Sequence, residues 1–475
     1  MSLVKNAASL FPSHRLRPLQ YLLALAWLAP LLVQAAELPK EWRTRQFLEP
    51  VFNSQLFVAE TGAQDKPVLL LVHGLGQVGM EDWMPVVPAL VNDFHVVLVD
   101  LPGFARSDAP AGRYSPSNYA KVLNALKRDI SEQPITVVGH SMGAAVSLRF
   151  AVLFPEAVRS LILVDAAGIL ERTAFLKEEA GSFTGDTVPL LGDASRNFGE
   201  LIAGVGLGWM DKIHDPTSSI GRFDFIWARV FNGKSNANAA LSLVNEDFSS
   251  AVYTLQQPVH LIWGGSDGVA PLRTGQMLAG QLAHADLQVI DGAEHVPMHS
   301  HTQQFNQRLL TALRADTTLP DHSAVSDAAV IEPNLGDYHC VDNRERLRIS
   351  GHYQTVVIEN CERVLLQDLQ AEQLIVRNAK VLLDNVRVAG PGTALTLVDS
   401  HLEGTNVSLS GDAAIDVSGS RLDLAGAELV AKEKGVVITE KSQLIFSIAK
   451  LRSGYYRGYL HGHYNLAATV LDVSL

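Results

Sequence analysis

The chain has 475 residues, of which 47% are hydrophobic and 19% are charged. This length favours two domains, and the composition excludes an intrinsically disordered chain because sizeable apolar cores can form. The formal net charge of -12 disfavours nucleic acid and anionic membrane surfaces as partners.

The amino terminus has the pattern of an export signal. A basic lead precedes the apolar residues 21–33, and Ala35 and Ala36 offer small residues for cleavage. The apolar stretch is shorter than the ~20 residues that a membrane span needs, and Pro30 interrupts it. We therefore expect residues 1–36 to be a signal peptide of a periplasmic or secreted protein, with retention as a membrane anchor as the less favoured alternative.

From about residue 42, apolar runs typical of buried strands alternate with stretches of helical spacing. The expected strands are 54–60, 68–72, 94–99, 135–138, 160–164, 259–263 and 287–290. The expected helices are 80–91, 119–130, 144–154, 274–282 and 302–313. This order predicts an α/β fold with a doubly wound, mostly parallel sheet over residues 42–315. A long interruption at about 168–255 predicts a helical lid over the carboxyl edge of the sheet.

The sequence Gly-His-Ser-Met-Gly at 139–143 joins an expected strand to an expected helix. A sharp strand–turn–helix is the setting that a serine nucleophile needs, and such a turn has room only for glycine at Gly139 and Gly143. It also holds the Ser141 hydroxyl at a helix amino terminus, where developing negative charge is favoured. Ser141 is therefore the candidate nucleophile, and the turn is expected to point the His140 side chain away from it.

A serine hydroxyl attacks only when a base removes its proton, and histidine has a suitable pKa near neutrality. His295 follows the last expected strand, so it is expected at the same sheet edge as Ser141. His299 and His301 are nearby, but they fall at or inside the next expected helix and are interpreted as surface residues. His295 is therefore the candidate base.

The base needs a carboxylate that orients it and stabilises the imidazolium. Asp267 follows the penultimate expected strand and gives the chain order Ser, Asp, His. Asp165 follows an earlier strand and is the alternative, with capping of the segment after it as its other possible role. We therefore predict a triad of Ser141, His295 and Asp267.

Five motifs in this order resemble the α/β-hydrolase superfamily over about residues 50–315. They are His73-Gly74-Leu75-Gly76, Asp100-Leu101-Pro102-Gly103-Phe104, Gly139-His140-Ser141-Met142-Gly143, Gly265-Ser266-Asp267 and Gly292-Ala293-Glu294-His295. The Gly-His-Ser-Met-Gly form is similar to serine esterases and monoacylglycerol-lipase-like members. The resemblance implies that the backbone N–H groups of Leu75, after His73-Gly74, and of Met142 form the oxyanion hole. We expect Asp100 to have a structural role, in which its side chain bonds the amides of a turn.

We expect an exported serine hydrolase that cleaves carboxylic esters of lipids or small molecules through an acyl-enzyme. Enzymes of the resembled fold that use aspartate as nucleophile are disfavoured by Ser141. Hydrolysis of carbon–carbon bonds in diketone-like substrates remains an alternative, and so does a non-catalytic surface or glycan-binding protein. No cofactor or metal is expected, since the glycine-rich loop at 73–76 lacks a Walker lysine.

After a polar linker at 316–335, the periodicity changes, and residues 336–475 are expected to form an all-β repeat domain. Apolar triplets recur about every 20 residues at 356–358, 374–376, 395–397, 415–417 and 436–438. Short strands separated by polar turns favour a parallel β-helix, with a β-sandwich as the alternative. This domain is a candidate for polysaccharide contact.

Two features of the repeat domain concern its side-chain chemistry. Cys340 and Cys361 are expected to form a disulfide in an oxidising compartment, with two free buried thiols as the alternative. His461 and His463 are disfavoured as a metal site because no carboxylate or cysteine lies close in sequence.

Overall fold

The computed structural model describes residues 37–171, 227, 229, 231, 233–315 and 335–470. The expected signal peptide, most of the expected lid and most of the expected linker lie outside the described residues. Leu38–Leu475 form one compact unit. Within the described ranges, no helix is both long and apolar enough to cross a membrane.

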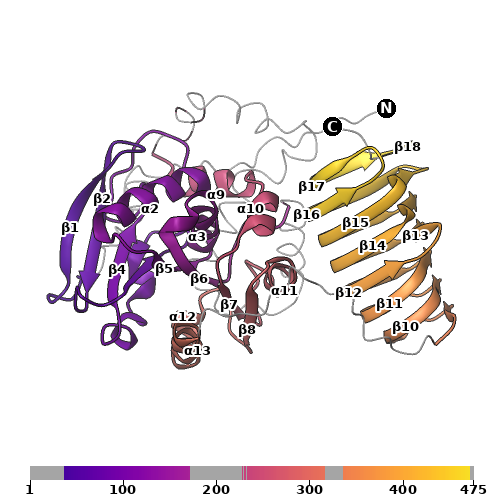
Figure 1. Cartoon of the computed structure of the whole chain (residues 1–475), viewed down its shortest axis with the longest axis horizontal. Coiled ribbons are helices and arrows are strands. Elements are labelled where there is room, and N and C mark those ends of the chain that lie inside the picture. Colours follow the sequence, from indigo (N-terminus) through magenta and orange to yellow (C-terminus); the bar gives the residue numbers. More distant parts are fainter. Residues whose placement is uncertain are drawn as a thin grey trace, which may run out of the picture. The chain divides into compact units, whose positions relative to one another are not determined.

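Eight strands of the described chain form one sheet, in the order β1-β2-β4-β3-β5-β6-β7-β8 (Figure 1). They are β1 (Arg43–Glu49), β2 (Ser54–Thr61), β3 (Val68–Val72), β4 (His95–Asp100), β5 (Ile135–His140), β6 (Val158–Val164), β7 (Val259–Gly264) and β8 (Ala285–Ile290). The pairs β1–β2 and β2–β4 are antiparallel, and all the others are parallel. The predicted doubly wound, mostly parallel sheet is confirmed, although edge strand β1 was not predicted.

Helices lie in the connections between the strands. The α-helices are α2 (Pro116–Ile130), α3 (Met142–Leu153), α9 (Ser235–Val244), α10 (Ser249–Thr254), α11 (Leu272–Gln281), α12 (Pro297–Ser300) and α13 (Thr302–Arg314), and the 3₁₀ helices are η1 (Gly79–Trp83), η2 (Val87–Ala89) and η3 (Pro155–Ala157). The single helix predicted at 80–91 is wrong, because the structure has two short 3₁₀ helices there. Pro85 and Pro88 lack the N–H groups that a continuous α-helix needs.

Both faces of the sheet are buried, as strand β3 shows. Leu70 and Val72 pack in one apolar cluster with side chains of α2 and α3. Leu69 and Leu71 pack in another, with residues of η1 and α13. Successive side chains of a strand point to opposite faces, so a continuous apolar run such as Val68–Val72 requires cover on both sides.

The carboxy-terminal part consists of parallel strands that stack in the order β9-β10-β11-β12-β14-β15-β16, with β13 pairing with β11 and β14 (Figure 1). The strands are β9 (Tyr338–Val341), β10 (Arg346–Glu359), β11 (Arg363–Arg377), β12 (Lys380–Ala389), β13 (Thr393–Val398), β14 (His401–Ser418), β15 (Arg421–Ile438), β16 (Ser442–Arg452), β17 (Arg457–Leu466) and β18 (Thr469–Val470). Only β17 and β18 pair antiparallel. Parallel pairing confirms the β-helix-like interpretation and contradicts a β-sandwich, whose sheets are antiparallel.

The repeated apolar triplets lie directly above one another. Val356 is aligned with Leu374, Leu374 with Leu395, Leu395 with Ile415, and Ile415 with Val436. All five side chains are buried in one core. Each copy of the repeat in the sequence therefore forms one rung of the stack.

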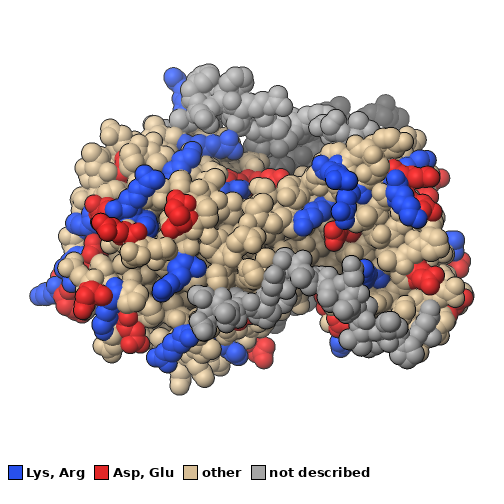
Figure 2. All heavy atoms as spheres, in the orientation of Figure 1, with Lys and Arg blue, Asp and Glu red and all other residues tan. Residues whose placement is uncertain are grey.

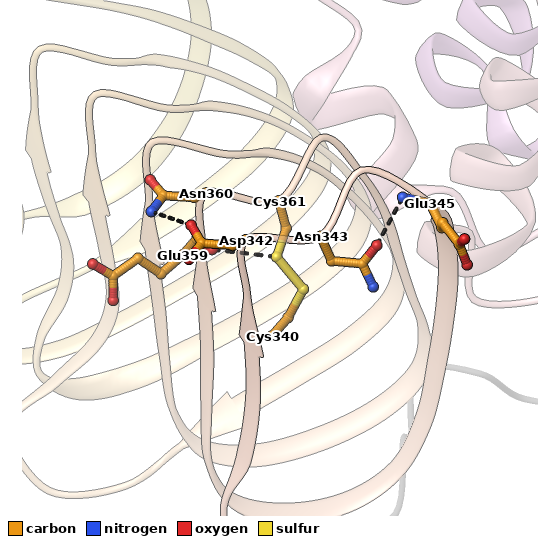
Figure 3. Close-up of a disulfide and its surroundings, with 7 residues drawn as sticks. All are labelled: Cys340, Asp342, Asn343, Glu345, Glu359, Asn360 and Cys361. Carbon is orange, nitrogen blue, oxygen red and sulfur yellow. Dashed lines mark hydrogen bonds between the residues drawn. A yellow bond between two sulfur atoms is a disulfide. The ribbon is translucent and has the colours of Figure 1, made fainter.

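A polar ladder forms the corner that follows these strands. Asp342, Asn360 and Asn378 all have positive φ, of 53°, 56° and 45°. The Asn360 side chain donates to Asp342 Oδ1 at 2.8 Å, and Asn378 donates to Asn360 Oδ1 at 2.8 Å. Figure 3 shows the first of these bonds beside a disulfide that joins Cys340 to Cys361.

Helix α11 also contacts the stack. The largely buried Arg273 side chain donates to Thr405 Oγ1 at 2.9 Å and forms an ion pair with Asp423 Oδ1 at 3.0 Å. From α10, the Tyr253 hydroxyl donates to the Ile448 carbonyl at 2.8 Å. Three residues of the stack, Ala425, Ile445 and Ile448, lie in the same apolar cluster as α2 and α3. The repeats are thus packed against the α/β part by apolar and charged contacts.

Charges are mixed on the face of the molecule that Figure 2 draws. Lys and Arg lie among Asp and Glu there, and no single-sign field covers that face.

Candidate active site

The turn between β5 and α3 holds Ser141 in a strained backbone conformation, with φ 53° and ψ -118°. A Cβ atom at Gly139 would lie 2.4 Å from the Gly143 carbonyl oxygen, and one at Gly143 would lie 2.4 Å from the carbonyl oxygens of Val72 and His73. Both positions therefore require glycine, as the motif predicts. The serine is consequently fixed between the end of β5 and the first turn of α3.

Three of the predicted residues form one hydrogen-bonded chain. His295 Nε2 lies 2.9 Å from Ser141 Oγ, and His295 Nδ1 lies 2.8 Å from Asp267 Oδ2. The residues come from the loops after β5, β7 and β8, which meet at the carboxyl edge of the sheet. Ser141 and Asp267 are 5% and 8% exposed, so bulk water screens these contacts little.

The hydrogen bonds of Asp267 indicate which nitrogen of His295 carries the proton. Asp267 Oδ1 accepts from the N–H groups of Val269 and Ala270, at 2.7 and 2.9 Å. An ionised carboxylate only accepts, so His295 Nδ1 carries a proton and donates it to Oδ2. The lone pair of Nε2 then faces Ser141 Oγ, which is the arrangement of a general base.

The loop after β3 packs against the nucleophile. His73 Nε2 accepts from the Leu101 N–H at 3.0 Å, so the ring proton is on Nδ1, which donates to the Gly74 carbonyl at 2.6 Å. A Cβ atom at Gly74 would lie 3.0 Å from the Ser141 Cβ, so a side chain there would crowd the nucleophile. Leu75 follows in this loop. The neutral His73 ring therefore holds the segment whose next N–H is the expected oxyanion donor.

Met142 is the first residue of α3 and directly follows Ser141. Its side chain is buried, at 1% exposure. The first N–H groups of a helix have no partner within the helix and are available to an anion. The structure thus places the backbone of Met142 beside the nucleophile and at a helix amino terminus.

His140 does not bond to Ser141, but it makes a contact that the sequence did not predict. Its Nε2 donates to the main-chain carbonyl of His295 at 2.8 Å. Its Nδ1 lies 3.8 Å from Asp82 Oδ2. Burial opposes the charge of Asp82, but the adjacent His140 imidazole holds the pKa of that carboxyl below its usual value. His140 thereby fixes the loop that carries His295.

The alternative residues lie elsewhere. Asp165 Oδ1 accepts from the Gly264 N–H at 2.8 Å, so its carboxyl is bonded to the end of β7 and not to His295. His299 is exposed, and its Nε2 contacts the Asp82 carbonyl oxygen. Asp100 accepts from the N–H groups of Met80 and Arg106, in agreement with a structural role. In the described ranges, no group of three or more His, Cys, Asp or Glu side chains is arranged to hold a metal ion.

Comparison with known proteins gives the same assignment of fold. Residues 67–302 match the family model described as the alpha/beta hydrolase fold. An uncharacterised protein of Mycobacterium tuberculosis is 28% identical over 257 residues, which are 50% of this chain and 73% of that protein. Neither comparison by itself gives a substrate.

Two named relatives have hydrolytic activities. Lipase 1 of Psychrobacter immobilis is 26% identical over 251 residues, which cover 52% of this chain and 76% of the lipase. A 2-hydroxy-6-oxononadienedioate/2-hydroxy-6-oxononatrienedioate hydrolase of a Pseudomonas species is 25% identical over 282 residues, covering 56% of this chain and 94% of that enzyme. The relatives therefore include hydrolases of more than one bond type.

Proposed function

We propose that this chain, which belongs to the α/β-hydrolase superfamily, is a serine hydrolase that cleaves carboxylic esters through an acyl-enzyme. One observation carries the proposal, namely the hydrogen-bonded chain from Ser141 Oγ through His295 to Asp267. The similarity to a bacterial lipase supports an ester as the substrate.

In the proposed reaction, Ser141 Oγ attacks the ester carbonyl while its proton passes to His295 Nε2. Asp267 stabilises the imidazolium through Nδ1. The N–H groups of Leu75 and Met142 stabilise the negative oxygen of the tetrahedral intermediate. When the intermediate collapses, His295 gives the proton to the departing alcohol. A water molecule, activated by the same base, then hydrolyses the acyl-enzyme and restores the Ser141 hydroxyl.

The test is labelling by a fluorophosphonate, which reacts only with an activated serine, together with turnover of p-nitrophenyl esters of increasing chain length. We expect labelling of the wild-type protein and none of Ser141→Ala, whose kcat should fall by roughly 10⁶-fold. Ser147, which is buried in the same helix, provides a matched control because Ser147→Ala should still be labelled. A folded wild-type protein that is not labelled would instead favour the non-catalytic binding protein.

A second candidate activity is hydrolysis of a carbon–carbon bond. It is favoured by the similarity to the 2-hydroxy-6-oxononadienedioate hydrolase, of which the match covers 94%. The same three residues serve either reaction, so labelling does not separate the two. Turnover of a vinylogous 2-hydroxy-6-oxo-dienoate that exceeds turnover of every ester in the panel would favour the carbon–carbon hydrolase.

We also propose that the protein is exported to the periplasm or beyond. The basic and apolar pattern of residues 1–36 supports this, and so does the disulfide between Cys340 and Cys361, since disulfides persist in oxidising compartments. Cell fractionation with mass spectrometry of the mature amino terminus tests it. A cytoplasmic protein that retains Met1 would refute it.

Contact with an anionic polysaccharide is proposed for the repeats. Arg346, Arg363 and Lys380 begin three successive strands, are exposed, and lie in adjacent registers on rungs about 4.8 Å apart. Such a column of cations suits a chain with regularly spaced carboxylates. Binding of alginate should weaken in Arg363→Glu but not in Arg377→Glu, an exposed arginine at the other end of the same strand. Equal binding by both variants would refute the contact.

A further inference from the structure

A second carboxyl group is buried behind the predicted triad. Asp165 directly follows β6, has a positive φ of 44° and has no exposed surface. Its Oδ1 accepts from the Gly264 N–H at 2.8 Å. Its Oδ2 is also buried, and no described residue donates a hydrogen bond to it. A carboxylate oxygen without a donor in such a place is costly.

The group beside Asp165 is another carboxyl. Gly264 links the two residues, since its N–H donates to Asp165 and its carbonyl accepts from the Asp267 N–H at 3.2 Å. The side chain of Asp165 contacts that of Asp267. Asp267 already accepts three hydrogen bonds, from two main-chain N–H groups and from His295. Both oxygens of Asp267 therefore already face a hydrogen-bond donor, whereas Asp165 Oδ2 faces none, so a proton shared by the two carboxyl groups belongs on Asp165.

We propose that Asp165 is a neutral carboxylic acid at neutral pH and that its O–H donates a hydrogen bond to the Asp267 carboxylate. This makes Asp165 a positioning residue for His295, which it never touches. The orphaned Oδ2 then has a partner, and the buried pair carries a single negative charge. The inference deepens the proposed function and rests on it as far as catalysis is concerned.

The electrostatics of the site agree with this assignment. Burial and the neighbouring Asp267 carboxylate raise the pKa of Asp165 well above its usual value. Two adjacent buried carboxyl groups cannot both ionise at low cost. The other titratable groups near this chain are His295 and, behind its carbonyl, His140 with Asp82. None of these groups donates a hydrogen bond to Asp165 Oδ2. Asp165 can therefore use this oxygen in a hydrogen bond only by carrying a proton and donating it.

Infrared difference spectroscopy tests the protonation state without any activity assay. The wild type minus Asp165→Asn spectrum should contain, at pH 7, the carbonyl stretch of a protonated carboxylic acid. In Asp267→Asn the same band should move to higher frequency, because an amide accepts more weakly than a carboxylate. Absence of the band from the wild type, or a band that Asp267→Asn leaves in place, would overturn the proposal.

The pH profile of kcat/KM tests the positioning role. In Asp165→Asn the amide oxygen can accept from Gly264 and the amide N–H can donate to Asp267, so we expect kcat/KM within about threefold of wild type and an unchanged acid limb. Asp165→Ala removes the donor, so Asp267 attracts the imidazolium more strongly. Its kcat/KM should fall by about tenfold, and its acid limb should move to higher pH.

Equal displacement of the acid limb by both variants would overturn the role of Asp165 as a donor. If Asp165→Ala does not fold, the infrared spectra of the other proteins still decide the proton assignment. Failure of the proposed function is separate, since it would appear as a wild-type protein that no fluorophosphonate labels.

Discussion

Replacing Asp267 with Asn should reverse the direction of its hydrogen bond with His295. The N–H groups of Val269 and Ala270 both require an acceptor at the Oδ1 position. The amide oxygen must therefore take that position, and the NH₂ group must take the place of Oδ2. It then faces His295 Nδ1, which at present donates to this site across 2.8 Å.

An NH₂ group cannot accept a hydrogen bond, so the imidazole changes tautomer and carries its proton on Nε2. That proton then points at Ser141 Oγ, where a lone pair is needed. Nδ1 also loses the carboxylate that stabilises the imidazolium. The wrong tautomer lowers kcat by about 10⁴-fold in serine hydrolases with this arrangement, which corresponds to about 5.4 kcal/mol in the barrier. We expect a loss of that order here.

The assay is single-turnover and steady-state cleavage of the best p-nitrophenyl ester by Asp267→Asn. The matched control is Asp286→Asn. Asp286 also contacts a histidine, His260, but this pair lies at the amino ends of β7 and β8, whereas Ser141 follows the carboxyl end of β5. The control should keep kcat within about twofold of wild type. If Asp267→Asn keeps more than a tenth of the wild-type kcat, the tautomer argument is refuted and the carboxylate does not orient the base.

Three further predictions concern stability. Arg273→Met should lower the free energy of unfolding by about 3–5 kcal/mol, because it leaves the Asp423 charge buried and unpaired. The double variant with Asp423→Leu should recover most of this loss. Equal urea midpoints for the single variant and the wild type would contradict the prediction. A hydrogen bond with His95 lowers the pKa of the Glu60 carboxyl to about 2, against the effect of burial. The stability that Glu60 gives the folded state is therefore present above pH 4.5 and is lost as the pH falls towards 2. Glu60→Gln should flatten the acid-unfolding curve in that window, and curves that superimpose would refute the assignment. The Cys340→Ala and Cys361→Ala double variant opens a loop of 21 residues and should cost about 3 kcal/mol in urea denaturation, an effect that reduction of the wild type should reproduce.

The parts of the fold that were predictable depend on short-range patterns. The run Val68–Val72 is apolar at every position, which indicates a strand buried on both faces before any partner is known. The triplets of the repeats are likewise recognisable because each rung repeats the same buried positions. The turn around Ser141 was predictable because a sharp turn leaves no space for a Cβ atom at its two glycine positions, and this requirement is local.

What the sequence did not predict depends on partners that are distant in the chain. Strand β1, Arg43–Glu49, is a half-exposed edge strand that pairs with β2 alone among the described strands, so it has no continuous apolar run. The bond from His140 to the His295 carbonyl joins residues 155 positions apart. Every residue has a main-chain carbonyl, so the amino-acid sequence does not indicate which one accepts this bond. The contact of Asp165 with Asp267 was missed for a similar reason. Either residue alone is a plausible orienting acid, and only the geometry shows that they share one site.

The placement of the contacts along the repeat stack has a consequence for how it opens. Rungs in such arrays are stabilised chiefly by their immediate neighbours, so local opening begins at an unsupported end. The α/β part contacts β14 to β17, which anchors the late rungs, whereas the β9 end is held by the Cys340–Cys361 bond. In a reducing medium, amide exchange should therefore start at β9 and β10 and advance rung by rung, while the anchored end stays protected.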